Sequence, residues 1–530
     1  MKHLLTAFGL AVLALALMLT GVSWPAMANN SHSSSASAPP ANVDDIEAYF
    51  HGQMKELGMP GAALGIIKDD KVVHVATYGE ADREEKRPVT ATTPFKIGST
   101  SKSFTALGVM QLVEEGKVDL DAPVQTYIPW FTAADAEASS RITVRHLLNQ
   151  VSGFTTATGV DYMYTTDTSD DALEREVRAS SEAELATPPG ETWQYSNRNY
   201  TTLGFLIQMV SGQSYEDYMQ QHVLEPLGMD RTYIRLEDAE ANDLATGHQY
   251  WFGRPVAGGG LSNNRAITPT GLISSSVEDM SRYLIAHVNS GEYQGQRVLS
   301  EQGVAQLHKG VAVMGSGPSK YGMGWFETTV GETPMLIHNG DTGDFHTTMM
   351  IAPSNGYGVV VLMNGSNGHA RADVPASGVM GMLMGAAAPA LPSAFGELAT
   401  MILLALAAAI VVQLAALIRS VVLIRRWQMY PARRPRGTFR MVLRIWVPAL
   451  LSLVWLLALT FVLPPMLSLP ISHMVKWDFG WLAITSAAIA LLWGVIAGPL
   501  LKAGSVRPTL SEPGAFDLRR DRPVPAGQRH

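Results

Sequence analysis

Three long apolar stretches near the C-terminus place the strongest constraint on how this chain can fold. They run over residues 398–418, 445–467 and 479–501. Each approaches the roughly 20 residues that a helix needs to cross a bilayer. The first contains Gln413 but no charged side chain, whereas a half-exposed globular helix carries charges on its outer face. We therefore predict three transmembrane helices within residues 398–501, after a hinge at residues 386–397.

Basic residues are distributed unevenly around these stretches. The link between the first and second holds eight arginines, namely Arg419, Arg425, Arg426, Arg433, Arg434, Arg436, Arg440 and Arg444. The tail, residues 502–530, holds six more basic residues, whereas the link between the second and third stretches has only Lys476. The positive-inside rule then predicts a cell membrane protein whose arginine-rich loop and basic tail are cytoplasmic and whose residues 29–394 lie outside.

The N-terminus predicts export. Residues 1–28 combine Lys2, an apolar run over residues 4–22 and an Ala26-Met27-Ala28 sequence, which is typical of a signal peptide. An uncleaved anchor helix is the alternative, and it exports the following residues equally. Residues 29–42, rich in Ser, Ala, Pro and Asn, are interpreted as a linker.

Charge and cysteine content exclude several functions. Residues 29–394 hold 23 basic and 42 acidic side chains, a net charge of −19, and residues 395–530 carry +10. An acidic exported part is a poor nucleic-acid binder. The chain contains no cysteine, so it has no disulfide framework and no thiolate metal site. We predict neither a metal nor a cofactor, and the protein partners are left open.

Hydrophobic periodicity predicts an α+β fold over residues 43–385. Apolar runs at residues 62–67 and 72–76 flank a charged turn and indicate a β-hairpin. A helical pattern follows from Ser99 to about Gly116, and strand patterns return at residues 347–351 and 359–363. We expect one antiparallel sheet, built from both ends of the domain and flanked by helices, with a helix-rich subdomain inserted between them.

Ser99 and Lys102 form the first candidate catalytic pair. They occupy the only Ser-x-x-Lys sequence in the chain. At the start of a helix this spacing places both side chains on one face, so the amine can reach the hydroxyl. The helix N-terminus also offers free backbone N–H groups to a developing oxyanion. The alternative is a capping serine with a surface lysine.

Two further motifs carry candidate groups. Tyr195-Ser196-Asn197 follows a turn-forming Pro-Pro-Gly sequence. A phenol beside an ammonium loses its proton more easily, so Tyr195 is a candidate base. Asn197 is expected to hydrogen-bond both Lys102 and a substrate carbonyl. His338-Asn339-Gly340 ends an apolar run that predicts a strand, where an extended substrate could pair with the edge. Structural alternatives are a loop tyrosine and a polar strand end.

The order of these motifs resembles that of class C β-lactamase-related and penicillin-binding-protein-like serine hydrolases. The segments that carry the resemblance are residues 94–106 (PFKIGSTSKSFTA), 111–121 (QLVEEGKVDLD), 143–148 (TVRHLL), 152–154 (SGF), 189–190 (PG), 195–197 (YSN) and 321–325 (YGMGW). The resemblance implies a β-lactamase/transpeptidase-like fold, a nucleophile at Ser99, a proton-handling Lys102 and a Tyr195 base. It also implies an oxyanion hole from the backbone N–H groups of Ser99 and Asp341.

The chain departs from this family pattern at the third motif. His338-Asn339-Gly340 stands where typical β-lactamases carry Lys-Thr-Gly, and residues 341–345 lack the usual Pro-Gly. A histidine there resembles the esterase and D-amino-acid peptidase branches, and it is mostly neutral near pH 7 unless its pKa is raised. We expect an acyl-enzyme hydrolase acting on D-amino-acid-containing peptides, amides or esters. A β-lactamase is the first alternative, and a non-catalytic receptor for penicillin or peptidoglycan fragments is the second.

Overall fold

A computed structural model describes residues 42–251, 253–315, 319–330, 333–366, 373–386, 393–430 and 478–503. The predicted signal peptide and the second apolar stretch lie outside these residues, as do nearly all of the linker and the tail. The chain separates into two compact units. The first extends to Met401 and the second takes up the chain from Ile402, apart from a short segment assigned to the first.

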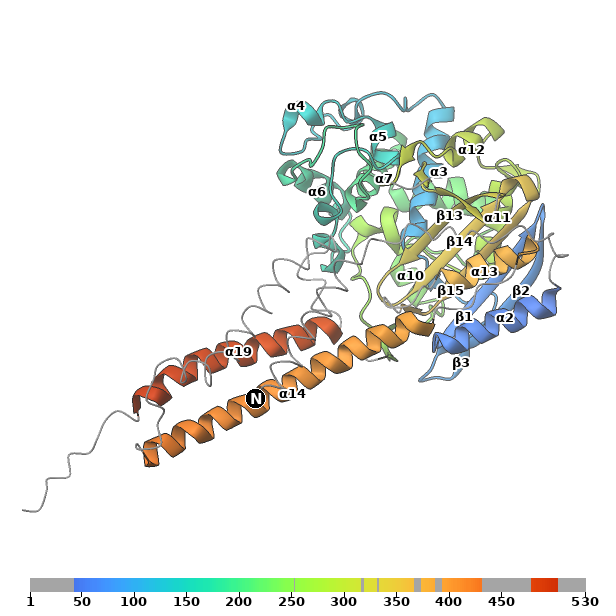
Figure 1. Cartoon of the computed structure of the whole chain (residues 1–530). Coiled ribbons are helices and arrows are strands. Elements are labelled where there is room, and N and C mark those ends of the chain that lie inside the picture. The colour runs from blue at the N-terminus through green and yellow to red at the C-terminus, as the bar shows by residue number, and fades with distance from the viewer. Residues whose placement is uncertain are drawn as a thin grey trace, which may run out of the picture. The chain divides into compact units, whose positions relative to one another are not determined.

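The first unit is built on one antiparallel sheet in the order β10-β11-β12-β13-β14-β15-β1-β2-β3 (Figure 1). Its strands are β1 Gly61–Lys68, β2 Lys71–Asp82, β3 Arg87–Pro88, β10 Ala312–Val313, β11 Lys320–Tyr321, β12 Phe326–Val330, β13 Thr333–Asp341, β14 His346–Ala352 and β15 Tyr357–Met363. The predicted hairpin is β1–β2, and the two late strand patterns are β14 and β15. Residue 62 pairs with Met363, so both ends of the domain share the sheet as expected.

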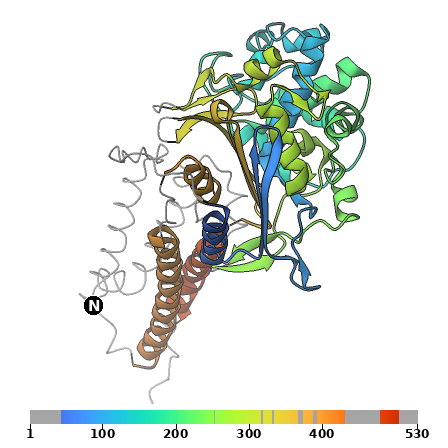
Figure 2. The same ribbon diagram turned by 90° about the vertical axis from the view of Figure 1, so that its right-hand side faces the viewer.

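Strict alternation along the central strands divides the core between the two faces of this sheet. Leu64 and Val361 pack with α2 (Val43–Glu56) and α13 (Val374–Leu383) on one face. Val360 and Leu362 face the opposite way, where α11 (Val277–Val288) covers β1 and β15. Figure 2 shows the sheet between these two helical layers. Because successive side chains of a strand point to opposite faces, strands covered on both sides consist almost entirely of apolar residues.

The helix-rich insertion lies between β2 and β10 in the sequence, as predicted. Its helices are α3 Ser101–Glu114, α4 Ala136–Ser139, α5 Val144–Leu148, α6 Ala172–Arg178, α7 Asn197–Ser211, α8 Tyr215–Met219, α9 Glu225–Leu227, α10 Leu236–Glu240, α11 and α12 Glu301–His308. Short strands pair within it, namely β4 Phe95–Lys96 with β7 Ser274–Ser275, β5 His248–Trp251 with β6 Arg254–Ala257, and β8 Glu292–Tyr293 with β9 Gln296–Arg297. Strand β5 also pairs with β16 Gly365–Ser366, which follows β15. Helix α3 is buried on all sides from Ser101 to Met110.

Two long helices are described beyond the domain. Helix α14 spans Ser393–Met429 and is longer than the first predicted stretch, and α19 spans Asp478–Ala503, close to the third. Gln413 donates from Nε2 to Oγ of Ser486 at 2.8 Å. Within the described residues, no helix combines the length and the apolar character that crossing a membrane requires.

Candidate active site

Ser99 lies in a tight turn directly before α3. The turn is the 3-10 helix η1, Gly98–Thr100. The hydroxyl of Thr100 donates to the carbonyl oxygen of Ile97, and that of Ser101 donates to the carbonyl oxygen of Gly98, both at 2.7 Å. These bonds hold the turn that leads into α3. Ser99 is half-buried, whereas its neighbours on both sides are buried. The predicted nucleophile is therefore the residue of this turn that a substrate can reach.

Lys102 lies one helical turn after Ser99, as its spacing predicted. Its Nζ is 3.2 Å from Oγ of Ser99 and donates to the carbonyl oxygen of Thr270 at 2.7 Å. The side chain is completely buried, and this burial lowers the pKa of the amine well below its usual value. Desolvation disfavours the charged form of a lysine. Lys102 is thus suited to accept a proton as a neutral amine, which a surface lysine is not.

Tyr195 is placed beside this pair by a loop that Gln150 holds. Oε1 of Gln150 accepts from the backbone N–H of Ser196 at 2.9 Å, and its carbonyl oxygen accepts from that of Gln194 at 2.8 Å. The Tyr195 ring centre is 4.8 Å from Nζ of Lys102, and its phenol is hydrogen bonded to Ser99. Burial raises the pKa of Tyr195 well above its usual value. The expected lowering is wrong, because desolvation outweighs any help from the amine.

Asn197 does not make the predicted contact with Lys102. It begins α7, and its side chain is directed toward residues 159–163. Its Nδ2 donates to the carbonyl oxygen of Gly159 at 3.3 Å and approaches Sδ of Met163 at 3.1 Å. Nζ of Lys102 donates to the carbonyl oxygen of Thr270 at 2.7 Å. Thr270 was missed because a backbone oxygen carries no signal in the side-chain sequence.

His338 lies within β13 rather than at its end, because the strand continues to Asp341. The ring is buried, and Nδ1 is 2.7 Å from the carbonyl oxygen of Asn339. Burial, with a smaller effect from Lys102, lowers the pKa of His338 to about 3. The imidazole is therefore neutral near pH 7, as expected. Asn339 is exposed and Gly340 is buried.

The backbone N–H groups of Ser99 and Asp341 are brought together by two glycines. Gly98 has a φ of +57°, and a Cβ there would lie 2.6 Å from the backbone nitrogen of Asp341. A Cβ on Gly340 would overlap the carbonyl oxygen of Ile97 and lie 2.8 Å from the nitrogen of Ser99. Only glycine allows such an approach of two backbones.

The Asp341 N–H also points to the open side of its strand. The backbone N–H of Thr342 donates to the carbonyl oxygen of Phe345. Along an antiparallel ladder, hydrogen-bonded residue pairs alternate with pairs that share no hydrogen bond. The pair Asp341–His346 is therefore a non-bonded pair, and β12 pairs with β13 only as far as Ile337. The Asp341 side chain is used elsewhere, because its carboxylate accepts from Ser366 at 2.5 Å.

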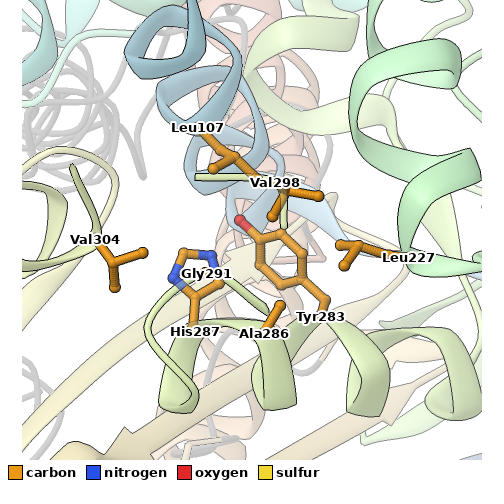
Figure 3. A pocket seen from close by; sticks show the side chains of 8 residues that line it. All are labelled: Leu107, Leu227, Tyr283, Ala286, His287, Gly291, Val298 and Val304. Carbon is orange, nitrogen blue, oxygen red and sulfur yellow. The ribbon is translucent and has the colours of Figure 1, made fainter. Parts of the chain in front are cut away.

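A separate hollow lies on another side of α3 (Figure 3). Its lining is mostly aliphatic and includes Leu107 of α3, Tyr283 and His287 of α11, and Val304 of α12. It shares no residue with the predicted site. In the described part of the chain, no three His, Asp or Glu side chains gather in a way that could hold a metal ion.

Residues 46–378 match the family model described as Beta-lactamase. The chain belongs to this family. It is 29% identical over 319 residues to protein flp of Staphylococcus aureus, a match covering 60% of this chain and 62% of that protein. The chain therefore matches less than two thirds of the length of flp. Penicillin-binding protein 4 of Amycolatopsis lactamdurans is 29% identical over 326 residues, which cover 60% of this chain and 84% of that relative.

Solved structures support the same fold for this Beta-lactamase family member. The octameric penicillin-binding protein homologue from Pyrococcus abyssi is similar with a TM-score of 0.57 and 30% sequence identity. The similarity covers 66% of this chain and 78% of that one. The β-lactamase/transpeptidase-like fold that the sequence implied is confirmed for the first unit.

Proposed function

We propose that this protein is a serine hydrolase that forms an acyl-enzyme at Ser99. The observation that carries the proposal is the buried amine of Lys102, 3.2 Å from Oγ of Ser99 and with its pKa lowered by burial. A serine hydroxyl is a weak nucleophile until an adjacent base removes its proton. A desolvated amine within hydrogen-bond distance supplies that base.

In the proposed reaction Oγ of Ser99 attacks the substrate carbonyl carbon while Lys102 takes the hydroxyl proton. The carbonyl oxygen becomes an oxyanion, which accepts hydrogen bonds from the N–H groups of Ser99 and Asp341. Tyr195, held as a neutral phenol by its raised pKa, donates its proton to the leaving group and is reprotonated by Lys102. Water then attacks the acyl carbon while Lys102 takes its proton. The bond between that carbon and Oγ of Ser99 breaks, and Oγ takes the proton from Lys102, which releases the carboxylic acid and restores the free enzyme.

The substrates that we propose are D-amino-acid-containing peptides, amides or esters. A neutral His338 offers no fixed positive charge to a substrate carboxylate, unlike the lysine that the β-lactamase pattern carries at this place. Charge-assisted hydrogen bonds are roughly twice as strong as neutral ones. A β-lactam, whose carboxylate needs such a partner, is accordingly the alternative substrate.

We also propose that the hydrolase domain is exported and attached to the cell membrane, with the C-terminal tail in the cytoplasm. This part rests on the sequence of residues 1–28, on the apolar stretches within residues 398–501 and on the arginines between them. Protease added to intact cells is expected to cleave the hydrolase domain and to spare the loop that contains Arg433. Cleavage of that loop without permeabilisation would reverse the proposed topology.

The test of the nucleophile is covalent labelling of the full-length protein with a fluorophosphonate, followed by peptide mass spectrometry. We expect the adduct on Ser99 and its complete loss in Ser99→Ala, with an unchanged melting temperature. Ser214→Ala is the matched control, because Ser214 also stands before a helix but only caps it through the N–H of Asp217. Undiminished labelling of Ser99→Ala would refute the proposal.

Substrate class is decided by comparing kcat/KM for a D-alanine-containing peptide with an amidated C-terminus, a short ester and a chromogenic cephalosporin. We expect the peptide or the ester to be the better substrate. A cephalosporin efficiency well above both assigns a β-lactamase instead. Penicillin binding that persists in Ser99→Ala, without turnover of any substrate by the wild type, assigns the receptor.

A further inference from the structure

A buried ion pair joins the two segments that carry the proposed oxyanion donors. Nζ of Lys96 lies 3.4 Å from Oδ2 of Asp344, and the two side chains are 11% and 6% exposed. Lys96 is three residues before Ser99, and Asp344 is three residues after Asp341. The pair therefore spans from the strand that leads into the nucleophile turn to the turn that follows the other donor.

We infer that the Lys96–Asp344 pair is a positioning element that sets the distance between the backbone N–H groups of Ser99 and Asp341. The inference rests on the proposed function, because it concerns the oxyanion hole of that same site. Both side chains are almost completely buried, so they act through the backbone to which they belong rather than on a substrate. Oxyanion donors must be preorganised at 2.7–3.1 Å from the oxygen that they stabilise.

Neighbouring contacts tie the pair to both segments. Phe95 and Phe345, adjacent to the paired residues, meet edge to face with ring centres 6.3 Å apart. On the strand side, Lys96 pairs with Ser274 of β7, and the next residue, Ile97, donates from its backbone to Ile273 at 2.9 Å. The lysine therefore extends from a fixed backbone, and a shift of Asp344 would be transmitted along it.

The turn that carries Asp344 is built around its carboxylate. Oδ1 accepts from the hydroxyl of Thr342 at 2.6 Å, and that hydroxyl oxygen accepts from the backbone N–H of Phe345 at 3.1 Å. A Cβ on Gly247 or on Gly260 would overlap the carboxyl group, so two glycines provide the space for it. This turn replaces the Pro-Gly sequence that the family pattern shows after the third motif.

A positioning role accounts for the buried Lys96–Asp344 pair, whereas a contribution to stability alone does not. Two charges that are removed from water lose hydration free energy, and their mutual attraction often does not offset this loss. Apolar residues of similar size therefore often stabilise a core equally well. Burial raises the pKa of Asp344 even though Lys96 lies beside it, as expected when desolvation is costly. A charged pair does, however, specify one geometry where an apolar contact tolerates several.

The experiment measures kcat and KM of the full-length protein for a short ester in Lys96→Met, Asp344→Asn, the double variant and Lys96→Arg. We expect kcat to fall by about tenfold or more in each single variant, less than the 10²–10³ that follows complete loss of one donor. KM should change by no more than about twofold, because uniform binding is retained. The double variant should be no worse than the worse single variant, since both remove one interaction, and Lys96→Arg should recover most of the activity.

The matched control is Asp279→Asn. Asp279 is also buried, accepts from a threonine hydroxyl and pairs with a cation, Arg282, but it lies in α11 outside the site. The Asp279→Asn variant should have a lower melting temperature without a selective loss of kcat. Equal kcat in wild type and Lys96→Met, or equal losses in Asp344→Asn and Asp279→Asn, would overturn the inference. If the fluorophosphonate does not label Ser99 in the wild type, the proposed function is overturned instead.

Discussion

Two clusters of mostly buried polar and aromatic side chains lie on or beside α3, and they differ in what surrounds them. The site cluster consists of Ser99, Lys102, Tyr195 and His338. The back cluster consists of Tyr283, His287, His308 and Trp325, where Tyr283 donates to Oγ of Ser103 at 3.0 Å and Nδ1 of His287 lies 2.9 Å from Nε2 of His308. Burial lowers the pKa of nitrogen groups in both clusters.

Of the two clusters, only the site cluster combines these shifts with an accessible side chain and a backbone donor. Ser99 is half-buried, and the N–H of Asp341 lies beside it at the open edge of β13. In the back cluster the rings of His287 and His308 meet each other and the ring of Trp325, beside a mostly aliphatic hollow. A strongly shifted pKa therefore indicates burial, and it indicates function only where a reactive group remains within reach of a substrate.

The sharpest test of this comparison removes one nitrogen group from each cluster. Lys102→Met should lower kcat/KM for an ester by about 10³ or more, within the range of general base catalysis. His287→Gln should leave kcat/KM within about threefold of wild type while lowering the melting temperature. A comparable loss of kcat/KM in both variants would remove the distinction between the clusters.

A smaller effect is expected from a glycine that the site requires. Gly340→Ala introduces a Cβ that overlaps the carbonyl oxygen of Ile97, so the two backbones must separate and the oxyanion donors with them. We expect kcat to fall by about 10². Gly52→Ala is the control, because a Cβ at this position in α2 meets no atom within 4 Å and alanine favours a helix by ~1 kcal/mol. Full activity in Gly340→Ala would contradict the proposed oxyanion hole.

The back cluster should appear in stability rather than in activity. Burial lowers the pKa of His308 to about 3, whereas an unfolded histidine titrates near 6.5. Between these values the unfolded state binds more protons, so stability rises with pH and is lost as the pH falls from about 6.5 toward about 3. Denaturant titrations should show a loss of about 1–2 kcal/mol at pH 5, reduced in His308→Gln. An unchanged pH dependence in that variant would show that the ring is not held neutral.

The smallest expected effect concerns the pH midpoint of kcat/KM, which we expect to be unchanged in His338→Gln. Acylation needs a neutral Lys102, so kcat/KM should decline as the pH falls through the lowered pKa of this amine. His338, with a pKa of about 3, should add no step between pH 5 and 8. The midpoint should therefore be the same in wild type and His338→Gln, even if the rate is lower. A midpoint that disappears in His338→Gln would make the histidine the titrating base.

Local patterns determined much of this protein in advance. Short apolar runs specify the β1–β2 hairpin and the strands β14 and β15, because a strand that is covered on both faces carries apolar residues at successive positions. The three-residue spacing of Ser99 and Lys102 specifies their contact, because residues three apart share a face of a helix. The order of the motifs was likewise enough to indicate the Beta-lactamase family.

Tertiary structure alone decided how the site works. The approach of Gly98 to Gly340, the carbonyl of Thr270 at the lysine and the turning of Asn197 toward Gly159 all depend on segments far apart in the chain. So does the direction of the Tyr195 pKa shift, which depends on how much water the folded chain excludes. Burial and long-range packing are properties of the whole fold, and no local spacing encodes them.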